Sequence, residues 1–382
     1  MSIAEATPGT EAGTTGKRLP TSGAIDCDNH PHFRNGIHDL GPYLSEAMSE
    51  RINVGNDVRG KGLPASEFKL PHPHYVNPGG GMRQDAVPPS GGAPNSDPEY
   101  TIKDHLDRFD LGASVLLGGQ VMGISGYADA DVAAAIASAY NDWMAENWLS
   151  ADPRFKGSIV VAPQDPAQAV AEIERCAGDE RMVQVFMPVM AGAAFGKRQF
   201  WPIYEVAEHY GLPVATHPGG ESAGMNAIMG AIDAPSYYFD FHTGLDQIYQ
   251  RTLISLVAEG VFEQFPRLKF GLIEGGFAWL PAVLWKMDKN WKGLRREVPW
   301  LKRLPSEYVR EHVRFTTQPM PEPPVAKWLD WLFEMAYGDE VMMFSTDYPH
   351  WDGDDADWAL KHIPKHLHQT IMVDTPMAYY RM

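Results

Sequence analysis

Three features of the 382-residue sequence predict a (β/α)8 barrel of the TIM type. Eight short apolar segments, rich in β-branched residues, recur at fairly even spacing along the chain, and helical patterns lie between them. Several of these segments are apolar on both faces, which is typical of a parallel sheet covered by helices. A doubly wound open sheet is the alternative, but it usually has fewer strands, and the first predicted strand is not followed by a dinucleotide-binding glycine fingerprint.

The eight predicted strands follow one another from residue 23 to residue 347. They are GAIDCD (23–28), ASVLLGG (113–119), GSIVVAP (157–163), MVQVFMP (182–188), LPVATHP (212–218), LKFGLIEGG (268–276), VRFTTQ (313–318) and VMMFSTD (341–347). Helical patterns cover 98–112, 129–150, 166–178, 198–211, 245–266, 278–291 and 323–338. The helix over 166–178 opens on Pro and closes on Gly, the usual order at helix ends.

Two connections are longer than ordinary loops and predict insertions after strands 1 and 5. They cover residues 34–98 and 218–244, and both follow the carboxyl ends of strands, where barrel active sites are built. We expect them to act as lids, subunit contacts or both. Residues 1–22 are rich in Thr, Gly, Ala and Glu and predict a disordered leader, which leaves 23–382 as a single domain.

Composition restricts the classes of partner. The formal charge of −17 argues against nucleic acid or an anionic membrane surface, and no apolar run reaches the length of a membrane-spanning helix. The two cysteines, Cys27 and Cys176, are too few for a disulfide framework and form no thiolate zinc motif. We therefore expect a cytoplasmic protein that acts on a small molecule, as a homodimer or as an oligomer that contains a paralogue.

The stretch AIDCDNHPHF (24–33) places acidic and imidazole side chains at alternate positions of the first strand, namely Asp26, Asp28, His30 and His32. Alternate residues of a strand point to the same face. Burying two carboxylates and two imidazoles on one face is costly unless an ion satisfies them. The stretch therefore predicts a cation at this end of the strand.

The other strands carry matching residues at their carboxyl ends. Besides Asp28 and His30 after strand 1, His217 ends strand 5, Glu274 ends strand 6 and Asp347 ends strand 8. All eight carboxyl ends meet at one mouth of a parallel barrel, so these five groups converge. Their donor types fit Zn²⁺, Mn²⁺ or Fe²⁺, as one ion or two, and the lack of thiolates argues against a closed structural zinc site.

Simpler explanations exist for each residue alone. A histidine after a strand can be a hydrogen-bonded structural group, and Asp347 can cap the segment that follows it. Each of these explanations accounts for one residue only, whereas a shared metal ion accounts for the placement of all five residues at the strand ends. His32, His242 and His350 lie near the same mouth and are candidates for substrate binding. Arg83 can clamp a substrate carboxylate or be a solvated loop residue.

Four motifs in this order resemble the amidohydrolase superfamily, in the branch that includes aminocarboxymuconate-semialdehyde decarboxylase. They are IDCDNHPHF, THPGG, FPRLKFGLIEGGFAWLP and FSTDYPHWDG. The resemblance implies a distorted TIM barrel in which Asp28, His30 and His217 bind a divalent metal and Asp347 is a ligand or a base. Relatives often carry a catalytic histidine in a GHGG-like motif after strand 6, whereas this chain has IEGG with Glu274.

Four functions follow from this set of residues. The first expectation is a metal-dependent hydrolase, in which Asp347 deprotonates a water that attacks an amide, ester or lactone of a small carboxylate-bearing substrate and Glu274 orients substrate or water. The second is a non-oxidative decarboxylase with the same ligands. The third is a dinuclear Fe or Mn oxygenase with Glu274 as a further ligand. The fourth is a non-catalytic barrel that serves as the structural partner of an active paralogue.

Overall fold

The computed structural model describes residues 21–54, 81–189, 192–218 and 236–382. Within these ranges eight parallel strands form one sheet, and each strand pairs with the next along the chain. The strands are β1 (Ile25–Asn29), β2 (Ala113–Leu116), β3 (Phe155–Val160), β4 (Met182–Phe186), β5 (Val214–Thr216), β6 (Phe270–Leu272), β7 (Val313–Thr316) and β8 (Met342–Met343). Each overlaps a predicted strand.

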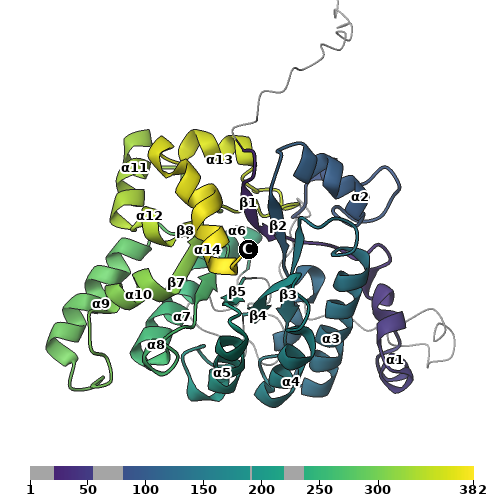
Figure 1. The fold of residues 1–382 in the computed structure, drawn as a ribbon, viewed down its shortest axis with the longest axis horizontal. Helices are drawn as coiled ribbons and strands as arrows, with labels where there is room; N and C mark the ends of the chain where they lie inside the picture. The colour runs from purple at the N-terminus through teal and green to yellow at the C-terminus, as the bar shows by residue number, and fades with distance from the viewer. Residues whose placement is uncertain (1–20, 55–80, 190–191, 219–235) are drawn as a thin grey trace, which may run out of the picture.

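The sheet closes between its first strand and the segment that follows its last one. The backbone N–H of Cys27 donates to the carbonyl of Phe344 at 3.0 Å, and that of His30 donates to Tyr348 at 2.8 Å. The strands occupy the centre of the molecule, and the helices surround them (Figure 1). The predicted (β/α)8 barrel is therefore confirmed, with a distortion at β8, which is only two residues long.

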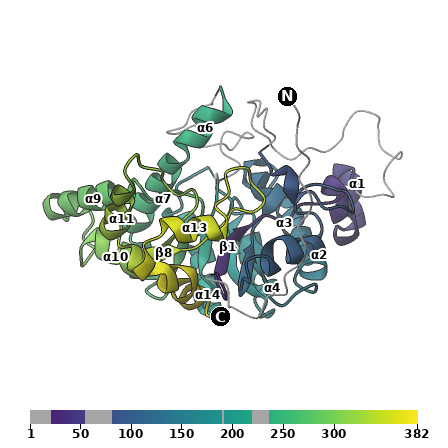
Figure 2. The same cartoon turned by 90° about the horizontal axis from the view of Figure 1, so that it is seen from above.

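The helices lie mostly in the connections between strands, and α6 projects away from the rest of them (Figure 2). They are α1 (Glu46–Ile52), α2 (Pro98–Thr101), α3 (Ala130–Asn147), α4 (Pro166–Cys176), α5 (Trp201–Tyr210), α6 (Tyr238–Gly244), α7 (Asp246–Ala258), α8 (Val261–Gln264), α9 (Leu280–Leu294), α10 (Pro305–His312), α11 (Ala326–Met335), α12 (Gly338–Val341), α13 (Ala356–His362) and α14 (Thr375–Tyr380). No helix of the described ranges is long and apolar enough to cross a membrane.

Local sequence signals explain several helix ends. Asp129 and Asp165 precede α3 and α4, and each side chain accepts hydrogen bonds from backbone N–H groups of the first turn. Pro166 occupies the first turn of α4, where a missing N–H group costs nothing. Gly211 ends α5 at φ +70°, in the left-handed region that favours glycine.

The helices differ from the predicted ones in three places. The predicted helix 245–266 is two helices, because Gly260 takes φ +79° between α7 and α8. The predicted helix 98–112 is α2 followed by a π-helical turn over Ile102–Asp107. The short helices α1, α6, α10, α13 and α14 have no predicted counterpart, and α12 shares only Gly338 with a predicted helix. Most of the predicted leader, residues 55–80 of the first insertion and 219–235 of the second lie outside the described residues.

His312, at the junction of α10 and β7, predicts an acid sensitivity of the fold. Its ring is stacked on Phe262, and its Nδ1 atom lies 2.9 Å from the carbonyl of Leu268. Burial lowers its pKa below the ordinary value. The unfolded chain therefore binds more protons than the folded one, so stability is complete above pH 6.5 or so and falls as the pH drops below it.

We expect His312→Asn to flatten the fall in unfolding free energy between about pH 6.5 and pH 5. Urea unfolding across this pH range measures the slope. The exposed His209 of α5 supplies the matched control, His209→Asn. An unchanged slope in His312→Asn would contradict the assignment.

Candidate metal centre

Four buried side chains from three distant parts of the chain meet at the mouth of the barrel. Asp28 lies in β1 and His30 just after it, His217 follows β5, and Asp347 follows β8. Each offers a ligand atom, and these atoms all lie within 4.8 Å of one another. The carboxyl ends of β1, β5 and β8 thus converge as the sequence predicts.

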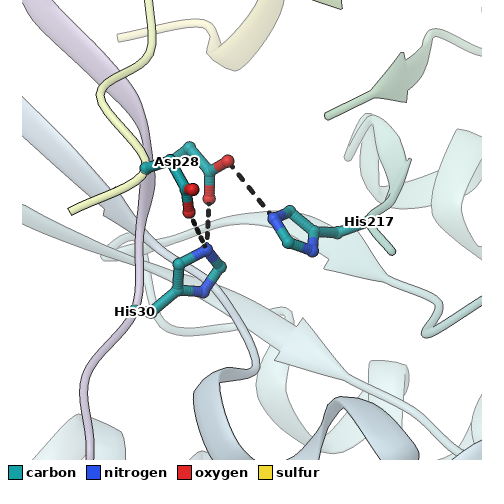
Figure 3. A group of neighbouring side chains, drawn as sticks. Asp28, His30 and His217 are labelled. Carbon is teal, nitrogen blue, oxygen red and sulfur yellow. Dashed lines mark ion pairs between the residues drawn. The ribbon is translucent and has the colours of Figure 1, made fainter. Parts of the chain in front are cut away.

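The separations within this cluster match those of a ligand set. His30 Nε2 lies 2.9 Å from Asp28 Oδ1 and 3.0 Å from Asp347 Oδ1, and His217 Nε2 lies 3.3 Å from Asp28 Oδ2. Figure 3 shows the Asp28 carboxylate between the two imidazole rings. Atoms that each lie about 2.1 Å from one ion are separated by roughly 3 Å or slightly more.

The donor atoms themselves call for a cation. Both oxygens of Asp28 and the Nε2 atoms of His30 and His217 are buried, and none has a hydrogen-bond partner outside the cluster and the adjoining Glu274. Buried polar atoms without partners are costly, and a divalent ion would satisfy all of them together. The cluster therefore fits a divalent metal.

Neighbouring groups orient the ligands. His217 Nδ1 lies 2.5 Å from the carbonyl of Pro218, which directs Nε2 into the cluster. Gln318 Nε2 donates to Asp347 Oδ2 at 3.2 Å, and His350 Nδ1 contacts Asp347 Oδ1. Asp347 and Glu274 both take φ +57°, a conformation that non-glycine residues adopt at a cost and mainly at functional sites.

The electrostatics of the cluster favour positive charge. Burial alone would lower the pKa of His30, but the charge of Asp28 and hydrogen bonds to Asp28 and Asp347 raise it to about 9. The pKa of His217 rises for the same reason, beside Asp28 and Glu274. Burial would raise the pKa of Asp347, yet the nearby His350 and His30 hold it low. Protons and a metal ion thus compete for these groups.

Asp26 does not join the cluster, although it precedes Asp28 on the same strand face. Its Oδ2 atom accepts from Thr346 Oγ1 at 2.9 Å and Ser114 Oγ at 3.1 Å and lies 2.8 Å from His105 Nε2. Its Oδ1 atom accepts from the backbone N–H of Thr346 at 2.8 Å. Asp26 therefore ties β1 to β2 and holds the residue next to Asp347 in place.

The weaker candidates lie at or near the mouth but in different surroundings. His32 is buried and does not belong to the group of four ligand residues. Burial and the nearby His350 and His30 lower its pKa to about 3, so the His32 ring is neutral. Arg83 donates to both oxygens of Asp85 at 3.0 and 2.6 Å, so its guanidinium is already paired. Its backbone N–H donates to Pro349, next to His350.

Glu274 and His242 belong to a second group together with Asp352, whose ligand atoms also lie within 4.8 Å of one another. Glu274 is buried, and its Oε2 atom lies 2.8 Å from His217 Nε2. Burial and the charge of Asp347 raise the pKa of Glu274. Sequence reasoning missed Asp352 and Gln318, although Asp352 lies inside the quoted motif FSTDYPHWDG and Gln318 ends the predicted strand VRFTTQ.

A family model described as Amidohydrolase matches residues 25–382, so the chain belongs to the amidohydrolase family. This confirms the predicted superfamily. The sequence is 26% identical to gamma-resorcylate decarboxylase of Polaromonas sp. over 258 residues, which are 64% of this chain and 76% of that protein. It is also 26% identical to gamma-resorcylate decarboxylase of Rhizobium sp. over 236 residues, 58% of this chain and 68% of the relative.

Solved structures share the fold. A 5-carboxyvanillate decarboxylase of Sphingomonas paucimobilis has a TM-score of 0.63 and 22% identity and covers 94% of this chain and 99% of its own. A dihydroxybenzoic acid decarboxylase of Polaromonas sp. with bound manganese and the inhibitor 2-nitroresorcinol has a TM-score of 0.62 and 18% identity, covering 94% and 97%.

These findings bear on the predicted function. The protein is an enzyme of the amidohydrolase superfamily, and its buried Asp/His cluster can hold a divalent metal, as predicted. The relatives favour the decarboxylase alternative over the hydrolase that the sequence suggested first.

Removal of the metal should destabilise the fold. An ion bound only by the folded state adds about 4 kcal/mol when its concentration is a thousand times Kd, so chelation should lower Tm by several degrees. Thermal melting before and after chelation, with metal content measured, tests this. Asp28→Ala should abolish the difference between the two curves. Unchanged melting after verified metal removal from the unsubstituted protein would refute the site.

Substitution of Asp26 should weaken the barrel. Asp26→Asn retains the shape of the side chain but loses the charge and at least one accepted hydrogen bond among Thr346, Ser114 and His105, at a cost of about 3 kcal/mol. Thermal melting of the metal-loaded protein measures the loss. The exposed Asp330 of α11 gives the control, Asp330→Asn, which should melt like the unsubstituted protein. Equal melting of the two variants would contradict this role.

Proposed function

We propose that this enzyme is a divalent-metal-dependent, non-oxidative decarboxylase of hydroxylated aromatic carboxylic acids. One observation carries the proposal: the chain pairs a buried Asp28, His30, His217 and Asp347 cluster with sequence similarity to gamma-resorcylate decarboxylases. Hydrolysis would use the same residues, but both curated relatives named above are decarboxylases.

The metal would be held by Asp28, His30, His217 and Asp347, with manganese as the ion that a related solved structure contains. When bound, it would supply a Lewis acid that stabilises the negative charge of the substrate during the reaction. The surrounding chain contributes a site with little solvent, because the side chains of Asp28, His30 and Asp347 are fully buried and that of His217 is 2% exposed. Low solvent access strengthens each electrostatic contact.

The reaction also needs a proton. The ring carbon that bears the carboxylate takes up a proton, the bond to the carboxyl carbon breaks, its electron pair returns to the ring, and CO₂ leaves. The Asp347–His350 pair would supply this proton. Asp347, whose own pKa is held low, would relay a proton that enters from solvent by way of His350, since His350 Nδ1 contacts Asp347 Oδ1 and the His350 side chain is 20% exposed. Gln318 fixes the other oxygen of Asp347, so the carboxylate keeps its orientation.

The remaining sequence predictions stay predictions. They are the single domain over 23–382, the cytoplasmic location, the homodimer or paralogue-containing oligomer, and the role of the 34–98 insertion as a lid or subunit contact. His32, His242 and Arg83 also remain candidates for substrate binding, and the pairing of Arg83 with Asp85 makes it the least available.

The substrate class can be tested directly. Manganese-loaded protein should convert 2,6-dihydroxybenzoate, or another ortho-hydroxybenzoate of a small panel, to the corresponding phenol with release of one CO₂. Chromatography of the phenol and a CO₂ assay measure the two products, and chelated protein is the control. If metal-dependent hydrolysis of an ester, amide or lactone panel appeared without any decarboxylation, the proposal would be wrong.

Asp347→Asn should reduce kcat by a factor of about 10² to 10⁴, because the amide cannot pass a proton to the ring. We expect the variant to retain most of its metal, since Asp28, His30 and His217 remain. Steady-state kinetics together with metal analysis separate the two effects, and Asp330→Asn is the matched control. Full activity of Asp347→Asn would remove Asp347 from the mechanism.

A further inference from the structure

A second group of donors lies beside the four-residue cluster. His242 of α6, Glu274 after β6 and Asp352 after β8 each offer a ligand atom, all within 4.8 Å of one another. His242 Nε2 lies 3.0 Å from Asp352 Oδ2. Glu274 adjoins the first cluster as well, because its Oε2 atom lies 2.8 Å from His217 Nε2.

The donor atoms of this group have no hydrogen-bond partner outside it. His242 Nε2 and Asp352 Oδ2 are both buried atoms that face only each other, although their side chains are 23% and 15% exposed overall. The Glu274 side chain is 9% exposed. The group thus repeats the feature that marks the first cluster, in which buried donor atoms face one another and have no hydrogen-bond partner outside the cluster.

The charge at the mouth also exceeds what one ion can balance. The carboxylates of Asp28, Glu274, Asp347 and Asp352 all line this region. Among the described residues, every ion pair that these four carboxylates make is with a histidine, and none is with a lysine or arginine. One divalent cation neutralises two of the four negative charges. A second cation would neutralise the other two in their ionised forms, whereas an isolated His–Asp pair would do so for Asp352 alone.

Aromatic side chains fix the imidazole of this group. The His242 ring centroid lies 5.4 Å from that of Tyr238 and 5.9 Å from that of Trp351. Trp351 Nε1 donates to the Tyr238 hydroxyl at 3.2 Å, which links α6 to the segment that carries Asp352. The donors from two separate segments are therefore held together by contacts other than their own.

We propose that His242, Glu274 and Asp352 form a second divalent-cation site next to the one held by Asp28, His30, His217 and Asp347. Its imidazole and carboxylate donors suit Mn²⁺, Fe²⁺ or Zn²⁺. This site goes beyond the proposed decarboxylase function, which requires one ion. Because His242 and Asp352 are more exposed than the ligands of the first cluster, the second ion binds more weakly and is lost first.

Titration with manganese(II) chloride tests the second site. Chelator-stripped full-length protein should bind two Mn²⁺ per chain by calorimetry, in a tight and a weaker step. His242→Ala and Asp352→Asn should each bind one, with the tight step preserved. The controls His209→Ala and Asp330→Asn replace exposed residues of the same types and should bind two. Electron paramagnetic resonance should detect magnetic coupling between the two ions in the unsubstituted protein and not in the Asp352→Asn variant.

Two results would overturn the second site. The first is a single Mn²⁺ per chain in the unsubstituted protein, and the second is two Mn²⁺ in both His242→Ala and Asp352→Asn. Retention of the tight step shows that a variant has folded. The stoichiometry does not depend on the substrate, so an inactive protein with two bound ions would contradict the decarboxylase proposal and leave the second site intact.

Discussion

The structure depends on one electrostatic constraint, the burial of carboxylates and imidazoles where the carboxyl ends of distant strands meet. Asp28, His30, His217 and Asp347 are almost inaccessible to solvent, and the Asp28 oxygens and the Nε2 atoms of His30 and His217 face only one another and other carboxylates at the mouth. Such a group of polar atoms destabilises a fold unless a cation satisfies it. Barrel closure at β1 and β8 brings two of these carboxylates together, so metal binding and the closure of the barrel support the same arrangement.

The barrel could be predicted because its strands are set by local sequence. Short apolar runs between helical patterns identify all eight strands, and their order follows from the alternation. The short helices could not be predicted in the same way. The segments of α10, α13 and α14 are six to eight residues long, too short to show a clear period, and their packing against the barrel stabilises them. The break at Gly260 likewise depends on a backbone conformation that a helical pattern does not reveal.

The metal cluster could be predicted because all parallel strands end at one mouth, which makes strand-end residues neighbours whatever their separation in sequence. The loops obey no such rule. Gln318 ends a predicted strand and Asp352 lies inside a quoted motif, but both lie beyond the ends of β7 and β8, so the folding of the segments after these strands brings them to the site. Strand alternation places Asp26 on the face of Asp28, yet hydrogen bonds to Ser114 and Thr346 give it a structural role. The Arg83 guanidinium, which the sequence analysis offered as a clamp for a substrate carboxylate, instead pairs with the carboxylate of Asp85 two residues away.

A crystal structure of the protein grown with manganese, with diffraction measured at the manganese absorption edge, tests the central claim most directly. The account predicts an anomalous peak within bonding distance of Asp28, His30, His217 and Asp347, with the first three side chains arranged as they are in Figure 3. A fully folded barrel without a peak between these side chains, or with manganese bound only elsewhere, would contradict it.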